Sequence, residues 1–136
     1  MLVADTELLF ALSPRDPKHR HALRALEAAR EVVIPDVALL EFQVVLRSRG
    51  APPSRVRLAL LALREILDEK GVRGVKTLSL ELLALQCDLE ERHGLSFFDS
   101  LIAAAALSLR AAVLSDDEDF DRVEGLERVP LTSFTG

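Results

Sequence analysis

Short apolar runs alternate with longer helical patterns along this chain of 136 residues. The runs lie at Leu2–Ala4, Val32–Ile34, Gly74–Leu78, Ala112–Leu114 and Arg128–Leu131. Runs that are this short, and mostly apolar without alternation, are typical of strands buried on both faces of a sheet. The pattern therefore predicts four to five short strands.

Between these runs, apolar positions recur with the spacing of amphipathic helices, and Pro, Gly and capping residues mark the ends. Asp36 and Ser54 are expected to cap the helices that they begin, and Gly50, Gly71 and Gly94 follow helix ends. The predicted helices are Thr6–Leu12, His19–Arg30, Asp36–Arg49, Ser54–Lys70, Ser79–His93 and Ser96–Arg110.

Strands that alternate with helices of about ten residues or more predict a parallel sheet covered on both faces. We therefore expect residues 1–136 to form one domain, a three-layer α/β/α sandwich with a parallel sheet of four to five strands. Right-handed crossovers bring the carboxyl ends of such strands to one edge, where ligands gather. No interdomain linker or internal repeat interrupts the pattern.

Four acidic residues stand where this fold would bring them to that edge. Asp5, Asp99 and Asp117 follow predicted strands or begin helices, and Glu41 lies one turn inside a helix. Each has an ordinary structural explanation, such as helix capping, a capping box that starts at Ser96, a solvated loop or a helix surface. Taken singly, each acid is more often structural than functional.

Taken together, the four acids favour a cation site. Two carboxylates about 4 Å apart repel by roughly 4 kcal/mol at an effective dielectric constant of 20. A helix dipole stabilises a carboxylate at its N-terminus by only about 0.3 to 1 kcal/mol. The repulsion is relieved when a cation binds or when one acid takes up a proton. Oxygen ligands suit Mg²⁺ or Mn²⁺, so a divalent-ion site is the hypothesis that convergence would support.

The four acidic segments also resemble, in order, the motifs of the PIN-domain family, and their span covers almost the whole chain. Ala4–Leu9 resembles the opening motif, in which an aspartate leaves the first strand and a hydroxyl residue follows. Ile34–Phe42 resembles the segment that carries the family's glutamate, and Phe97–Ala106 the helix of its third acid. Leu114–Phe120 resembles its T-x-D-x-D-F loop, with Ser in place of Thr.

The resemblance implies a metal-dependent ribonuclease that binds Mg²⁺ or Mn²⁺. It makes Asp5, Asp99 and Asp117 the main metal ligands, Glu41 the residue that completes the cluster, and Asp119 an auxiliary ligand. The implied reaction is hydrolysis of an RNA phosphodiester by a metal-activated water, which leaves 5′-phosphate and 3′-hydroxyl ends without a covalent intermediate.

Two hydroxyl residues and one departure from the family pattern accompany these acids. Thr6 and Ser115 are expected to orient the carboxylates as hydrogen-bond donors. Position 7, often Asn or Ser in the family, is Glu7, which we expect to be an outward-facing helix residue rather than an extra ligand. The small residues Ala103–Ala106 are expected to let their helix lie close to the sheet.

Composition and net charge exclude further classes of protein. With 17 basic and 22 acidic residues, the net charge of −5 argues against tight non-specific binding of nucleic acid, but not against RNA contacts through local arginines. Cys87 is the only cysteine, which excludes an internal disulfide, and its apolar surroundings predict a buried, inert thiol. Without a signal peptide or an apolar run of roughly 18 residues, a cytoplasmic protein with no membrane association is expected. Candidate substrate-facing arginines are Arg15, Arg47, Arg49 and Arg92.

A single PIN domain of this size resembles the VapC-type toxins of toxin–antitoxin pairs, which implies a homodimer and an antitoxin partner. Val56–Leu67 carries more apolar residues than one core face needs, which is consistent with a dimer face or with a large core. The alternatives are an RNA-processing PIN nuclease without an antitoxin and a non-catalytic scaffold that binds RNA or protein. A receiver domain is excluded because no adjacent acid pair follows the first strand, and a dinucleotide-binding fold because no strand leads into a Gly-rich turn.

Overall fold

A single five-stranded sheet, in which all strands run parallel, organises the computed structural model of the chain, which describes all 136 residues. The strand order is β3-β2-β1-β4-β5, so β1 lies in the centre. Val3 of β1 pairs with Val33 of β2 on one side and with Val113 of β4 on the other. The strands are β1 (Leu2–Ala4), β2 (Val32–Pro35), β3 (Arg73–Val75), β4 (Ala112–Leu114) and β5 (Arg128–Val129).

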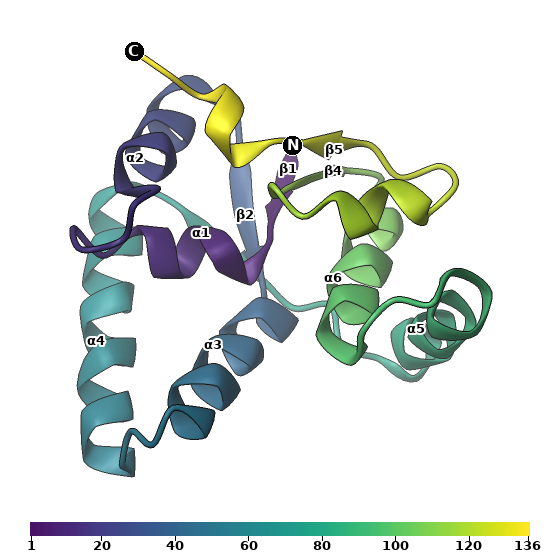
Figure 1. The fold of residues 1–136 in the computed structure, drawn as a ribbon, viewed down its shortest axis with the longest axis horizontal. Coiled ribbons are helices and arrows are strands. Elements are labelled where there is room, and N and C mark those ends of the chain that lie inside the picture. The colour runs from purple at the N-terminus through teal and green to yellow at the C-terminus, as the bar shows by residue number, and fades with distance from the viewer.

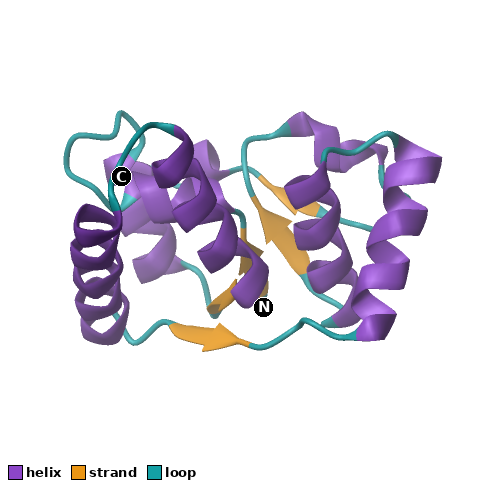
Figure 2. Cartoon of the chain, turned by 90° about the horizontal axis from the view of Figure 1, so that it is seen from below, coloured by secondary structure: helices purple, strands orange, loops and turns teal.

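Helices cover both faces of this sheet, as the sequence pattern predicts. The chain crosses from β1 to β2 to β3 in one direction and then returns to β4 and β5, so the two sets of crossover helices lie on opposite faces. In Figures 1 and 2, α1, α2 and α4 lie on one side of the sheet and α5 and α6 on the other. The helices are α1 (Thr6–Ala11), α2 (His19–Ala28), α3 (Asp36–Ser48), α4 (Pro53–Glu69), α5 (Leu80–His93) and α6 (Phe97–Ser108), with 3₁₀ turns η1 (Glu118–Arg122) and η2 (Leu131–Ser133).

Helix α6 is the most deeply buried helix. Each residue from Leu101 to Ala106 is at most 2% exposed, and the helix contacts α3, α5, β1 and β4. Small side chains allow this close approach, because the Cβ atoms of Ala103–Ala106 are fully buried without displacing the sheet. The expected packing role of these alanines is confirmed, and it holds the first turn of α6 against the carboxyl edge of the sheet.

Several details differ from the sequence-based expectations. The third strand is Arg73–Val75 rather than Gly74–Leu78, because the chain leaves the sheet after Val75 to meet α3. Helix α4 begins at Pro53 with no side-chain cap, so the capping role expected for Ser54 is wrong; Pro is well suited to a first helical position because it needs no N–H acceptor. Cys87 is exposed rather than buried, since α5 turns Leu82, Gln86 and Leu89 toward the core instead.

No helix combines the length and the apolar character that crossing a bilayer requires.

Candidate metal centre at the carboxyl edge of the sheet

The acidic residues singled out in the sequence lie at the carboxyl edge of the sheet, where α3 and α6 approach each other. Asp5 follows the central strand β1 directly, and Asp117 lies in the loop that follows β4. Asp99 lies in the first turn of α6, and Glu41 lies in α3. Four segments far apart in sequence therefore supply these side chains.

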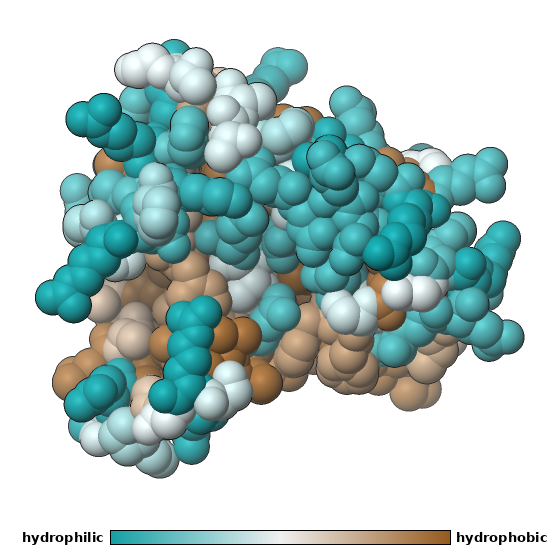
Figure 3. All heavy atoms as spheres, in the orientation of Figure 1, coloured by the Kyte–Doolittle hydropathy of each residue, from teal (hydrophilic) through white to brown (hydrophobic).

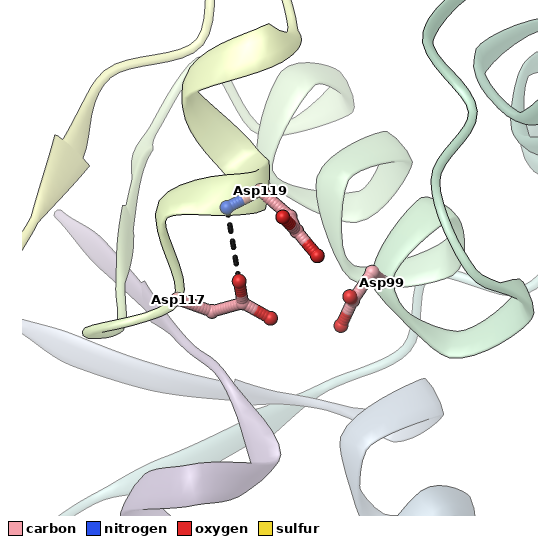
Figure 4. A group of neighbouring side chains, drawn as sticks. All are labelled: Asp99, Asp117 and Asp119. Carbon is pink, nitrogen blue, oxygen red and sulfur yellow. Dashed lines mark hydrogen bonds between the residues drawn. The ribbon is translucent and has the colours of Figure 1, made fainter.

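Two of these carboxylates, those of Asp99 and Asp117, form a tight cluster with that of Asp119, whereas Asp5 and Glu41 are not part of this cluster. One carboxylate oxygen from each of Asp99, Asp117 and Asp119 lies within 4.8 Å of the other two. In Figure 4 the side chain of Asp99 on α6 points toward those of Asp117 and Asp119 at the start of η1. This grouping of oxygen ligands could hold a hard divalent cation.

Local capping sets the direction of these side chains. The Ser96 hydroxyl accepts a hydrogen bond from the Asp99 amide at 3.4 Å and caps α6, so the carboxylate of Asp99 is not required as the cap. At η1, the Asp117 carboxylate accepts from the Asp119 amide at 2.9 Å (Figure 4). The helix starts thus position the acids, and capping alone does not account for Asp99.

Asp5 is the most deeply buried acid of the site, at 7% exposure. Its Oδ2 accepts a hydrogen bond from the Ser115 hydroxyl at 2.6 Å, and its Oδ1 accepts from the Thr6 amide at 2.7 Å. The same Ser115 oxygen accepts from the Asp117 amide at 3.0 Å. Ser115 therefore links the acid after β1 to the loop after β4 and fixes their relative position.

Glu41 is tied to the same edge through Thr6. The Thr6 hydroxyl donates a hydrogen bond to Oε1 of Glu41 at 2.5 Å, which joins α1 to α3. Thr6 is itself buried, so this bond holds the Glu41 carboxylate in one orientation. Thr6 and Ser115 thus both donate to carboxylates of the site, as expected of the two hydroxyl residues.

The electrostatics of the site favour a bound cation. Burial, together with the nearby charges of Asp99 and Glu41, raises the pKa of the Asp5 carboxyl to about 7. Burial, together with the charges of Asp117 and Glu41, raises the pKa of Asp99 to about 6, and burial raises the pKa of Glu41. Carboxyls that resist ionisation in the absence of a cation are what crowded, desolvated oxygen ligands should show. The donor set therefore fits a divalent ion such as Mg²⁺ or Mn²⁺.

The neighbouring acids Asp116 and Glu7 face away from the cluster. Lys18 Nζ lies 2.8 Å from Asp116 Oδ2 and 3.3 Å from Glu7 Oε2, and the Thr132 hydroxyl donates to Asp116 Oδ1 at 3.0 Å. Glu7 also accepts from the Asp116 amide at 3.1 Å. The side chain of Glu7 is 24% exposed, so it is less open to solvent than expected of an outward-facing helix residue, and it holds the loop after β4 through the Asp116 amide.

Asp36 is another acid with a structural role. It is the first residue of α3 rather than its cap, and its carboxylate accepts from the Thr77 hydroxyl and amide at 2.5 and 3.0 Å and from the Leu78 amide at 3.2 Å. Although partial burial opposes it, these hydrogen bonds lower the pKa of Asp36. Asp36 thus ties the segment after β3 to α3.

Of the arginines proposed from sequence, three are engaged away from the cluster. Arg47 donates to Gln43, Arg92 donates to Asp88, and Arg49 stacks over the Phe10 ring. The arginine that contacts the cluster is Arg122, whose Nη2 donates to Asp119 Oδ1 at 2.6 Å. Arg122 was not among the arginines proposed from sequence; the available signal was its position three residues after Asp119, where the i and i+3 side chains of a helical turn meet.

The fold and the cluster define a small α/β protein with a group of carboxylates that fits a metal ion at the carboxyl edge of a parallel sheet. A protein-family model described as PIN domain matches residues 2–126, so the chain belongs to the PIN-domain family. A search of curated proteins finds no match.

Solved structures of toxin–antitoxin proteins share this fold. The sarcin-ricin loop cleaving toxin VapC20 of Mycobacterium tuberculosis superposes with a TM-score of 0.70 at 22% identity, covering 89% of this chain and 93% of that one. A toxin–antitoxin complex from Klebsiella pneumoniae gives a TM-score of 0.68 at 20% identity, over 96% and 98% of the two chains. VapBC2 of Rickettsia felis, bound to a promoter DNA fragment, gives a TM-score of 0.67 at 18% identity, covering 95% of this chain and 97% of that one.

Proposed function

We propose that this chain is a Mg²⁺- or Mn²⁺-dependent endoribonuclease that hydrolyses RNA phosphodiester bonds. The observation that carries the proposal is the cluster of Asp99, Asp117 and Asp119 beside the buried carboxyl of Asp5. Membership of the PIN-domain family and the fold shared with an RNA-cleaving toxin support it. Acids placed this closely are costly to ionise without a cation, and hydrolysis of RNA is a reaction in which such a cation is useful.

In this proposal Asp5, Asp99 and Asp117 are the main ligands, Glu41 completes the set and Asp119 is auxiliary. The chemistry that a bound divalent ion supplies is activation of water and stabilisation of negative charge on the phosphate. The side chains hold their carboxylates ready for it, because Ser115 fixes Asp5 and Thr6 fixes Glu41 by hydrogen bonds.

Both oxygens of Asp5 accept one hydrogen bond each, from the Thr6 amide and the Ser115 hydroxyl. A carboxylate oxygen has two lone pairs, so these bonds orient the group and still leave acceptor capacity for a cation. Burial of Asp5 excludes bulk water from one side of the centre. These residues thus orient the carboxylates and place a region of low dielectric constant on one side of the centre. Both effects strengthen charge interactions there.

RNA cleavage is the experiment that tests the proposal. The purified protein is incubated with a panel of RNA stem-loops and single strands in Mg²⁺, Mn²⁺ or EDTA, and the ends of the products are mapped. We expect cuts only with metal, leaving 5′-phosphate and 3′-hydroxyl ends. Thermal stabilisation by metal without cleavage of any RNA would favour the alternative, a non-catalytic scaffold. Cleavage in EDTA would contradict the role of the acids as metal ligands.

We further propose that the protein acts as the toxin of a toxin–antitoxin pair and forms a homodimer. The structural neighbours include toxin–antitoxin complexes. Figure 3 shows hydrophobic side chains gathered over α3 and α4. On α4, Leu58 and Leu61 are 63% and 51% exposed, whereas Leu63 and Leu67 of the same apolar run enter the core. The apolar surplus of Val56–Leu67 therefore supplies both core and surface, and exposed leucines favour a protein partner.

The mass of the protein in solution, measured by light scattering, tests for the homodimer and for the antitoxin. We expect the chain alone to have twice its mass of 15.0 kDa, and a larger mass after co-purification with the product of an adjacent gene. A Leu58→Asp, Leu61→Asp variant is expected to be monomeric, because charged side chains do not pack at an apolar interface. A wild-type monomer that binds no such product would instead favour an RNA-processing nuclease without an antitoxin.

A further inference from the structure

Arg122, the last residue of η1, bridges the acidic cluster and the end of α5. Its Nη2 donates to Asp119 Oδ1 at 2.6 Å, and its Nη1 donates to the backbone oxygens of Gly94 at 3.1 Å and His93 at 3.4 Å. Gly94 caps the C-terminal end of α5 in the left-handed conformation, with φ of 66°, and carbonyl groups at a helix end have no acceptor role inside the helix. The guanidinium is therefore held between a carboxylate and the negative end of a helix dipole.

No other cation forms an ion pair with any of the five acids of the proposed centre. Lys18 pairs with Glu7 and Asp116, and Arg128 pairs with Asp121, all of which lie outside the cluster. Arg122 is thus the one fixed positive charge in direct contact with an otherwise acidic centre.

The Arg122 side chain also keeps free donor capacity. A guanidinium has five N–H donors, and the three hydrogen bonds to Asp119, Gly94 and His93 leave two of them without a protein acceptor. The side chain is 48% exposed, so a ligand can reach it.

A phosphodiester needs such a group beside an acidic centre. A metal ion offsets the charge of the carboxylates, but the phosphate brings its own negative charge into a protein whose net charge is −5. Arginine binds phosphate through paired N–H donors, and a donor already held in place loses little entropy on binding.

We propose that Arg122 binds a phosphate group of the RNA next to the metal centre, and that Asp119 and the end of α5 hold its guanidinium in position for that contact. This inference rests on the proposed ribonuclease function. It also gives Asp119 a second task, because one of its oxygens is already engaged by Arg122.

Binding and cleavage of the same RNA test this role. Affinity for a fluorescein-labelled RNA stem-loop is measured against salt concentration in an Asp99→Asn background, where hydrolysis is suppressed, with and without Arg122→Gln. Cleavage and the thermal shift caused by Mn²⁺ are measured in the wild-type background. Arg92→Gln is the matched control, because Arg92 makes a comparable exposed pair with Asp88 on α5. Arg122→Lys preserves the charge if the Gln variant folds poorly.

We expect Arg122→Gln to lower kcat/KM by about 10- to 100-fold, as loss of a hydrogen bond between charged groups does, while the response to Mn²⁺ is retained. The slope of log affinity against log salt should fall by about 0.7 to 0.9, the effect of one lost phosphate contact, and Arg122→Lys should restore part of it. Arg92→Gln should change neither quantity.

Two results would overturn the inference. One is an Arg122→Gln variant that cleaves RNA within about twofold of wild type with an unchanged salt slope. The other is loss of the Mn²⁺ response together with cleavage, since Arg122 would then act by shaping the metal site. A wild-type protein that cleaves no RNA refutes the proposed function instead, and the salt slope then still decides whether Arg122 contacts phosphate.

Discussion

Replacing Asp99 by Asn is expected to abolish the stabilisation of the protein by Mn²⁺ or Mg²⁺ and to lower RNA cleavage by about 100-fold or more. A ligand that binds only the folded state at a hundred times its dissociation constant stabilises that state by about 2.7 kcal/mol. Asp99 supplies one of the three clustered carboxylates, and Asn removes its charge while keeping its shape. Thermal unfolding with titrated metal, followed by cleavage assays, measures both effects.

Asp116→Asn is the matched control for Asp99→Asn. Asp116 is the neighbour of Asp117 in sequence, but its carboxylate faces Lys18 and Thr132. We expect this variant to keep its metal response even if its unfolding midpoint falls. If the wild-type midpoint does not respond to metal, and metal-free Asp99→Asn is the less stable protein, Asp99 serves only the start of α6 and the catalytic proposal fails.

Replacing Asp5 by Asn is expected to stabilise the metal-free protein at pH 8, by as much as about 4 kcal/mol. Burial raises the pKa of Asp5 from 3.8 to about 7, so its carboxyl prefers the protonated form in the folded state. Between these two values the unfolded chain releases the proton first, and stability falls as pH rises; one pKa unit corresponds to 1.36 kcal/mol. Below about pH 4 both states are protonated, and the benefit of the Asn disappears.

Denaturant unfolding of wild type and Asp5→Asn in EDTA, from pH 4 to pH 8, measures this difference. Asp36→Asn provides a control of opposite sign: its hydrogen bonds lower the pKa of Asp36 despite some burial, so its contribution to stability is present above the unfolded pKa and is lost as pH falls through the folded one. An Asp5→Asn protein that is less stable than wild type at pH 8 in EDTA would contradict the burial of a costly charge at this position. Saturating Mn²⁺ should reverse the order of the two proteins.

Most of the fold could be predicted from local pattern. Runs such as Val32–Ile34 are short and apolar because both faces of an interior parallel strand are covered, and a helix such as α6 is indicated by its Ala- and Leu-rich composition and by the cap at Ser96. Both signals depend only on neighbouring residues. The order of strands and helices, and the placement of Asp5 and Asp117 after strands, follow from the same information.

The predictions from sequence were wrong where distant segments decide which face of a helix is buried or which residues a loop contacts. Cys87 lies in an apolar stretch, but the packing of α5 against α6 turns Gln86 inward and Cys87 outward. Glu7 has the sequence position of a surface residue of α1. Only the tertiary structure brings Lys18 and the Asp116 amide to its carboxylate, which then holds the loop after β4 in place. Helical periodicity indicates that one face is buried, but a weakly amphipathic helix leaves the choice of face to its neighbours.

The sequence by itself determined the α/β class, the single parallel sheet and the candidate acids, because each depends on residue type and local spacing. Only the tertiary structure decided which carboxylates meet, which one is buried and which arginine faces them. Ser115 donates to Asp5 across 110 positions of the sequence. Coulomb repulsion and loss of hydration depend on distances of a few ångströms and on exposure to water, and these quantities exist only once the strands have brought such distant residues to one edge.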